Sequence, residues 1–297
     1  MNDLKVDLEN YNFKINSLKY EGNVVIIDTN DGKYVYKDKK NNYEIYDYLL
    51  SRGFSFYPKT INSKNSKYEL TEYINENKVS REQKVNDLIH ITGFLHKKTS
   101  FNKEIDMDDL KIKYENYQND ANYLMNYYQN LNNYIDSSTF MSPLEYLLVR
   151  NIDLFYYLIS FVKVESSNWY KLLENKKSIS YCMIHDNLDL SHLIEGNNLY
   201  LISWDRAHLD TPIKDLKKIY QDNYDVIDLE NFISEYEKEN NLSYVDKLFL
   251  LLELSIPKRI EFGKNMYLDC YNLSKYITYL RKIASLIQKI EKKNEKI

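Results

Sequence analysis

The stretch from Cys182 to Leu216, CMIHDNLDLSHLIEGNNLYLISWDRAHLDTPIKDL, decides the fold of this chain. It holds a polar loop that contains His185 and His192. The interval from Leu193 to Trp204 is strand-like on both sides of the turn EGNN, which predicts a hairpin. A loop, a hairpin and the start of a helix follow one another here, with several polar side chains among them. The question is whether those side chains carry out a reaction.

The first quarter of the chain predicts a small α/β unit. Two β-rich runs, NVVIIDT and KYVYK, are joined by NDG, a strong hairpin signal. The segment NNYEIYDYLLSRGF places Ile45, Tyr48 and Leu49 at helical spacing and ends at Gly53. After Pro58, KYELTEYI alternates as a further strand.

The rest of the chain predicts mostly helices. SREQ, which starts at Ser80, is typical of a capping box completed by Gln83. A long polar helix is expected over DMDDLKIKYENYQNDANYLMNYYQNLNNY. Another begins at SPLE, with Ser142 as cap, Pro143 in the first turn and Glu145 completing the box. One face of the last helix carries Ile277, Leu280, Ala284, Ile287 and Ile290.

Composition describes an ordinary ordered protein and excludes several classes. The 297 residues, 43% hydrophobic and 28% charged, are enough for a sizeable core. A net charge of -4 lacks the basic footprint of nucleic-acid binding. Cys182 and Cys270 are too few for a disulfide framework and have no metal-ligand spacing. The 30 tyrosines fit an AT-rich genome, or alternatively a surface made for stacking or cross-linking.

Two segments bear on membranes and export. MNDLKVDLEN has no apolar core of the signal-peptide type. Polar residues interrupt the most apolar stretch, LEYLLVRNIDLFYYLISFVKV, at Glu145, Arg150, Asn151 and Asp153. We therefore expect no signal peptide, no membrane span and a cytosolic place of synthesis.

Several segments together resemble the aminoglycoside phosphotransferase and choline kinase superfamily, above all its bacterial spore-coat kinase-like branch (CotS and YutH type). IHDNLDLSHLI matches the family's loop of His-Gly-Asp, four residues and Asn, and LYLISWD matches its Ile-Asp-Phe/Trp-Asp strand. The other matches, in chain order, are YVYK, YEIYDYLLSRGFSFYPKTI, YELTEYI, LIHITGFLHKKTS and TPIKDL. The resemblance spans about residues 20 to 290. It implies an α+β, bilobal protein-kinase-like fold, with a small lobe over residues 1–76 and a helical lobe over 77–297 that contains the loop 182–216.

The resemblance also implies a role for each matched residue of the small lobe. Lys37 would hold nucleotide phosphates, with Glu44 as its partner. An exposed lysine at a strand end is an equal alternative, because three more lysines are near it: Lys33, Lys39 and Lys40. Glu72 and Tyr73 lead to the hinge between the lobes and would bind a nucleotide if one binds at all.

Three positions depart from the catalytic pattern. Asn187 stands where the family has the proton-accepting aspartate, and His192 where it has the metal-binding asparagine. Ser203 replaces the metal-binding aspartate. An amide cannot act as a general base, and imidazole is a poor ligand for Mg²⁺. The sequence therefore argues against ordinary ATP-dependent phosphoryl transfer.

The resemblance assigns framework roles to two further residues. His185 matches the histidine that holds the loop to the following strand, as an ordinary core histidine would also do. Asp215 matches an aspartate that braces the loop, the alternative being a solvated charge at a helix start. Acidic side chains near the loop could take over the chemistry or, with His192, bind another metal, and we predict neither. These side chains are Asp186, Asp189 and Asp205.

Three hypotheses follow. The first is a catalytically inactive kinase-fold protein, a pseudokinase, without cofactor or metal and with protein partners in the spore coat of a low-GC spore-forming bacterium. That location rests on the resemblance alone. The second is a divergent small-molecule phosphotransferase that binds ATP and Mg²⁺, which a cleft closed by His192 or Trp204 would exclude. The third is a mostly helical interaction protein with no strand-rich lobe around residues 20 to 75.

Overall fold

The computed structural model describes residues 13–22, 24–38, 43–61 and 68–294. The chain forms two compact units, one of Met1–Ile91 with His185–His208 and one of Thr92–Ile184 with Leu209–Ile297. The predicted domain boundary after residue 76 stays a prediction. The two compact units do not show which segments fold on their own. Lys39 and Lys40, two of the lysines considered above, lie outside the described residues.

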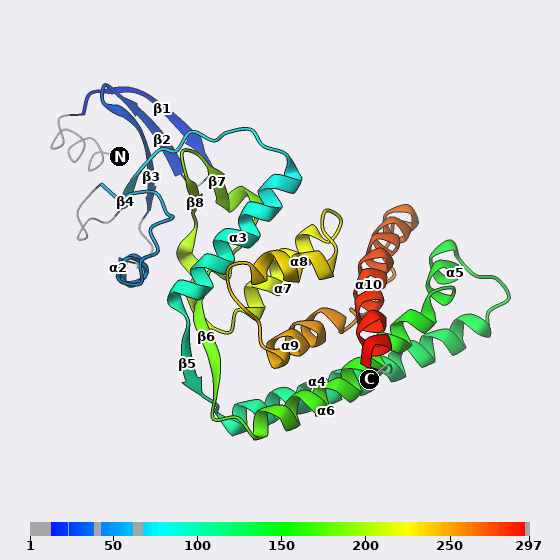
Figure 1. Cartoon of the computed structure of the whole chain (residues 1–297). Helices are drawn as coiled ribbons and strands as arrows, with labels where there is room; N and C mark the ends of the chain where they lie inside the picture. The colour runs from blue at the N-terminus through cyan, green and yellow to red at the C-terminus, as the bar shows by residue number, and fades with distance from the viewer. Residues whose placement is uncertain (1–12, 23, 39–42, 62–67, 295–297) are drawn as a thin grey trace. The chain divides into compact units, whose positions relative to one another are not determined.

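The first unit is built on a four-stranded antiparallel sheet (Figure 1). Its strands, in spatial order, are β1 Ile15–Glu21, β2 Val24–Thr29, β3 Gly32–Asp38 and β4 Tyr68–Glu72. The hairpin expected at NDG joins β2 and β3, and the strand expected in YELTEYI is β4. Gly32 has a φ of 140°, which suits glycine at this turn. The hypothesis without a strand-rich lobe is therefore wrong.

Alternation along the strands divides the sheet into two faces. Ile27, Tyr34, Tyr68 and Leu70 form a buried cluster on one face. Successive side chains on a strand point to opposite faces, so Glu69, between two members of this cluster, points to the other face. The polar residues of the candidate site in the first unit lie on that second face.

The predicted helix after the hairpin is also present. It is α2, Tyr43–Ser51, and the chain leaves it through Gly53, whose φ of 74° is a left-handed conformation that glycine adopts without strain. Farther along the chain, α3 covers Arg81–Thr99. The hairpin expected around EGNN is formed by β7, Leu193–Glu195, and β8, Leu199–Leu201.

Only half of the capping box predicted for α3 forms. Ser80 Oγ accepts a hydrogen bond from the backbone N–H of Gln83 at 3.1 Å. The Gln83 side chain, however, donates to both carboxylate oxygens of Asp87 at 2.9 Å. A carboxylate one turn ahead is a charged acceptor, and it holds the amide that the complete box would need. The box predicted at Ser142 and Glu145 is present in both halves.

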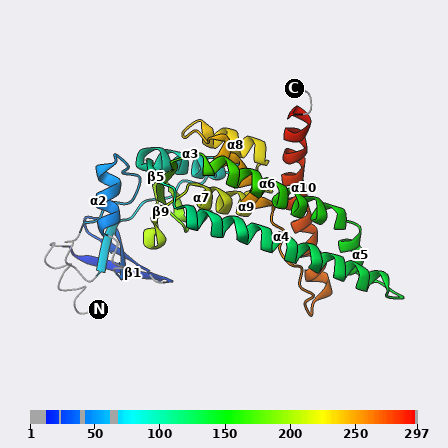
Figure 2. The same cartoon turned by 90° about the horizontal axis from the view of Figure 1, so that it is seen from below.

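Helices make up most of the second unit (Figures 1 and 2). The long helices α4 and α6 run side by side, and a three-stranded sheet has the order β5-β6-β9. The elements are β5 Phe101–Glu104, α4 Met107–Asp136, α5 Pro143–Val149, α6 Ile152–Glu174, β6 Ser178–Ile184, β9 His208–Asp210, α7 Ile213–Asn223, α8 Leu229–Glu237, α9 Tyr244–Ser255 and α10 Met266–Asn294. The antiparallel sheet of the first unit and the mostly helical remainder of the chain confirm the predicted α+β fold class. Among the described residues, no helix is both long and apolar enough to cross a membrane.

Gly93 allows α3 and α8 to approach closely. A Cβ added at this glycine would lie 2.8 Å from the Cβ of Glu239 and 3.4 Å from both the ring and the carbonyl oxygen of Tyr236. We expect Gly93→Ala to lower the free energy of unfolding by about 1 to 3 kcal/mol, since the clash outweighs the helix propensity of alanine. Urea unfolding followed by circular dichroism measures this change. Lys97→Ala, at an exposed position of the same helix, should change stability by less than about 0.5 kcal/mol.

Candidate functional site

A partly buried ion pair lies on the second face of the sheet. Lys37 on β3 and Glu69 on β4 stand opposite each other in the strand register. Lys37 Nζ lies 3.0 Å from Glu69 Oε2, and the glutamate side chain is 8% exposed. A carboxylate this deeply buried requires a charged or hydrogen-bonded partner, and Lys37 supplies it.

Tyr46 joins this pair from α2. Tyr46 lines the same cavity as Lys37 and Glu69, and the charge of the Glu69 carboxylate acts on its hydroxyl. Burial, followed by the charge of Glu69, raises the pKa of Tyr46 well above its ordinary value, so the phenol stays protonated. The Lys37–Glu69 ion pair and the Tyr46 hydroxyl thus lie at the same cavity, with the glutamate bound by the lysine.

The partner predicted for Lys37 was wrong. Glu44, at the start of α2, is exposed, and the ion pair that the structure gives Lys37 is with Glu69. Glu69 holds this place because the register of β3 and β4 puts it directly across from the lysine. Lys37 is therefore not a solvated lysine at a strand end, the other interpretation of the sequence. An alternation count on YELTE could have placed Glu69 on the face opposite the apolar cluster.

This cavity, of about 220 Å³, opens beside the ion pair. Four residues singled out in the sequence line it, namely Lys37, Glu72, Tyr73 and Ser203. Its walls also include apolar side chains from two strands of the sheet and from the 185–208 segment, among them Val24, Ile26, Val35, Ile194 and Ile202. The cavity therefore combines an apolar interior with an ion pair at one side, the usual make-up of a small-molecule site.

The loop that follows β6 is anchored by His185. Its ring is fully buried, and Nε2 lies 2.9 Å from the carbonyl oxygen of Ile202. The ring also meets Trp204 edge-on, with 4.7 Å between ring centroids. His185 thereby ties the start of the loop to the strand end that carries Ser203.

Two of the three positions expected to hold the base and the metal ligands, Asn187 and His192, are occupied by residues that contact each other. His192 Nδ1 lies 2.5 Å from the backbone carbonyl oxygen of Asn187, so this ring nitrogen donates to the loop itself. Ser203 adopts a left-handed conformation with a φ of 68°. Across the described part of the chain, no group of three or more His, Cys, Asp or Glu side chains is arranged to hold a metal ion.

Trp204 and His192 are the two side chains that could have closed the cleft, and neither of them lines the cavity. Trp204 is 1% exposed, packs against Phe54 and His185, and donates from Nε1 to the carbonyl oxygen of Leu201 at 2.8 Å. His192 is held by the loop. The cavity beside Lys37 thus stays open to a ligand.

The nearby aspartates occupy the surface of the loop. Asp186 has a φ of 53°, and its carboxylate lies 3.9 Å from His208 Nδ1. Asp189 Oδ1 accepts from the backbone N–H of Ser191 at 2.7 Å and so caps a turn. Asp186, Asp189 and Asp205 are all exposed.

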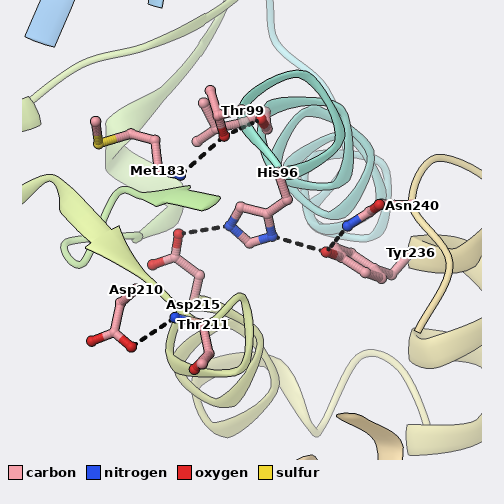
Figure 3. A network of polar contacts seen from close by, with 9 residues as sticks. His96, Thr99, Met183, Asp210, Thr211, Asp215, Tyr236 and Asn240 are labelled. Carbon is pink, nitrogen blue, oxygen red and sulfur yellow. Dashed lines mark hydrogen bonds and ion pairs between the residues drawn. The ribbon is translucent and has the colours of Figure 1, made fainter. Parts of the chain in front are cut away.

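Asp215 belongs to a buried network in the second unit (Figure 3). Its Oδ2 lies 3.2 Å from His96 Nε2, and His96 Nδ1 lies 2.9 Å from the hydroxyl of Tyr236. Asn240 donates from Nδ2 to that hydroxyl at 2.8 Å. Asp215 is 1% exposed, so the alternative of a solvated charge at a helix start is wrong. Its predicted bracing of the catalytic loop stays a prediction.

Sequence reasoning missed His96 and Tyr236. A signal for His96 was present, because it lies on the buried stripe of α3, four residues after Thr92 and three before Thr99. A histidine at such a position needs polar partners. The identity of those partners could not be inferred, since Asp215 and Tyr236 are 119 and 140 residues away.

Comparisons with known proteins give structural matches alone. No protein-family model and no curated protein matches the sequence. An aminoglycoside phosphotransferase from Alicyclobacillus acidocaldarius is 12% identical, with 93% of each chain covered and a TM-score of 0.64. The AMP-bound complex of a spectinomycin phosphotransferase is 14% identical, with 95% of this chain and 94% of that chain covered and a TM-score of 0.50. These likenesses show that the chain has the kinase-like fold of such phosphotransferases.

Proposed function

We propose that this chain is a kinase-fold protein that does not transfer phosphoryl groups and acts as a binding component. The observation that carries the proposal is the set of side chains at the three catalytic positions. Asn187 has no basic group, and Ser203 has no carboxylate. Mg²⁺ is held mainly by carboxylates and phosphates, and phosphoryl transfer depends on this charge neutralisation.

Two contacts support the proposal. The His192 ring is engaged with the carbonyl oxygen of Asn187, so its Nδ1 is not presented to a metal. The positive charge of Lys37 is neutralised by Glu69 at 3.0 Å. A nucleotide phosphate would have to compete with this carboxylate for the lysine.

A second candidate is a divergent small-molecule phosphotransferase. The observation in its favour is the open cavity of about 220 Å³ that Lys37 and Ser203 both line. It requires an acidic side chain in a new role, and Asp186 and Asp205 are the nearest in sequence. In this reading ATP and Mg²⁺ bind, and a small-molecule hydroxyl receives the phosphoryl group.

Descent and location are also proposals. The ordered motifs around residues 20 to 290 support common descent with the aminoglycoside phosphotransferase and choline kinase superfamily. Their likeness to the spore-coat branch supports a role in coat assembly, with other coat proteins as partners. Detection of the protein in purified coat extracts by mass spectrometry tests this location.

The decisive experiment is isothermal titration of the purified chain with ATP, with and without Mg²⁺. We expect no phosphoryl transfer, and any ATP affinity should change by less than about twofold when Mg²⁺ is added, because no carboxylate stands at residue 203. Lys37→Ala is compared with Lys33→Ala as a control, since Lys33 lies on the same strand and is exposed. Ser203→Asp restores a carboxylate at a left-handed position that aspartate tolerates.

The outcomes separate the two candidates. Micromolar ATP binding that requires both Mg²⁺ and Lys37 would overturn the inactive reading and justify a substrate screen. If Ser203→Asp tightens Mg²⁺–ATP binding about tenfold or more, the missing carboxylate explains the metal independence of the parent.

A further inference from the structure

A second cavity, of about 130 Å³, lies in the helical unit, apart from the candidate site. Trp169 and Phe249 form its aromatic wall, stacked with 5.2 Å between ring centroids. Leu110 and Leu173 add buried apolar surface. Several lining residues are exposed, so the cavity opens to solvent; they are Lys103, Glu104, Asp106 and Asp109.

Lys113, on α4, places its amino group in this cavity without a polar partner. Nζ lies 4.0 Å from the ring centroid of Phe249. Within the described ranges, Lys113 has no hydrogen bond and no carboxylate at ion-pair distance. The nearby carboxylate of Glu253 is already bound by Lys217 at 2.8 Å and by the hydroxyl of Tyr117.

This environment disfavours the charged form of the amine. The face of an aromatic ring attracts an ammonium only weakly, and it replaces none of the water that burial removes. Burial therefore lowers the pKa of Lys113, with Lys214 and Lys217 adding to the effect and Glu253 and Asp210 opposing it. At neutral pH a larger fraction of Lys113 is a free, nucleophilic amine than of an exposed lysine.

We propose that this cavity is a covalent binding site, in which Lys113 forms a reversible imine with a small aldehyde or ketone that has an apolar body. The nitrogen lone pair attacks the carbonyl carbon, and the nitrogen proton passes to the oxygen, giving a carbinolamine. Protonation of that hydroxyl releases water, and loss of the second nitrogen proton leaves the neutral imine. The sum is amine plus carbonyl to imine plus water, with no oxidant or reductant.

The other charged groups of the cavity favour a neutral ligand over an anion. The lining holds the carboxylates of Glu104, Asp106, Asp109, Asp210 and Asp246. Only Lys103 joins Lys113 on the positive side. These carboxylates would repel a carboxylate or phosphate ligand, whereas a carbonyl compound carries no charge. Carboxyl groups at the mouth can also exchange the protons that carbinolamine dehydration requires.

The test uses benzaldehyde as the probe and sodium cyanoborohydride to reduce the imine, followed by peptide mapping with mass spectrometry. Lys111 is the internal control, because it lies two residues away on the same helix and its side chain is 63% exposed. At pH 7 we expect Lys113 to be labelled faster than Lys111, since a lowered pKa leaves a larger fraction of the amine unprotonated. The advantage should shrink as the pH rises toward 10, where ordinary lysines also lose their proton.

Two further measurements test the cavity rather than basicity alone. Benzyl alcohol has nearly the shape of the probe but no carbonyl carbon, so it should slow labelling at Lys113 and leave Lys111 unchanged. Phe249→Leu keeps an apolar wall and removes the ring, and it should alter the rate at Lys113 alone. Equal or slower labelling of Lys113 relative to Lys111, or no protection by benzyl alcohol, would overturn the proposal. None of these results depends on nucleotide binding, so the outcome is separate from that of the proposed function.

Discussion

Replacing His96 by alanine is expected to lower the free energy of unfolding by about 3 to 5 kcal/mol. His96 is fully buried and stands between Asp215 and Tyr236. With Asp215 ionised, Nε2–H donates to the carboxylate, Nδ1 accepts from the tyrosine hydroxyl, and Asn240 donates to the tyrosine oxygen (Figure 3). Alanine removes a donor from a buried carboxylate and an acceptor from a buried hydroxyl, and no water replaces them.

Matched variants distinguish the loss of these hydrogen bonds from a simple loss of buried side-chain volume. Tyr236→Phe removes one hydroxyl and should cost about 1 to 2 kcal/mol. His208→Ala deletes an exposed histidine and should cost less than about 0.5 kcal/mol. In a double-mutant cycle, His96→Ala with Asp215→Ala should lose clearly less than the sum of the single losses.

Urea unfolding monitored by circular dichroism provides these values. Additive losses in the cycle would show that the carboxylate and the imidazole do not depend on each other, contrary to the geometry. A loss below about 1 kcal/mol for His96→Ala would mean that water satisfies the groups left behind.

Local chemistry explains what could be predicted of the fold. NDG and EGNN predict their turns through the conformations that these residues favour, and both hairpins are present. Ser142 and Glu145 are three residues apart, so their capping box depends on nothing distant. β1 was missed because its burial pattern is mostly exposed, and an edge strand with few buried side chains has little apolar alternation to detect.

The residues of the candidate site that belong to motifs matched in chain order could be predicted from the sequence. Lys37, Glu72, Tyr73 and Ser203 were singled out from the sequence and line one cavity. The pairing of Lys37 with Glu69 was not, because it depends on the register of two strands separated by a helix and a loop. His96 and Asp215 meet only through tertiary packing, which no local pattern encodes.

Trp204→Ala is expected to cost about 3 to 5 kcal/mol of unfolding free energy, the range for deleting a fully buried tryptophan. Trp204 is 1% exposed and meets Phe54 and His185 edge-on. The substitution leaves a large cavity between these rings and removes the Nε1–H···O bond to Leu201. Trp204→Phe is the matched control, and it should cost less because most of the apolar volume remains.

The size of this loss bears on the proposed function. Trp204 directly follows Ser203, where the metal-binding carboxylate of the resemblance is absent. A large loss would show that the segment from His185 to Trp204 stabilises the first unit without any catalytic part, as an inactive kinase fold requires. A loss below about 1 kcal/mol would show that it contributes little to the core. The intact loop and hairpin would then require a ligand-binding explanation, which is the prediction of the divergent phosphotransferase.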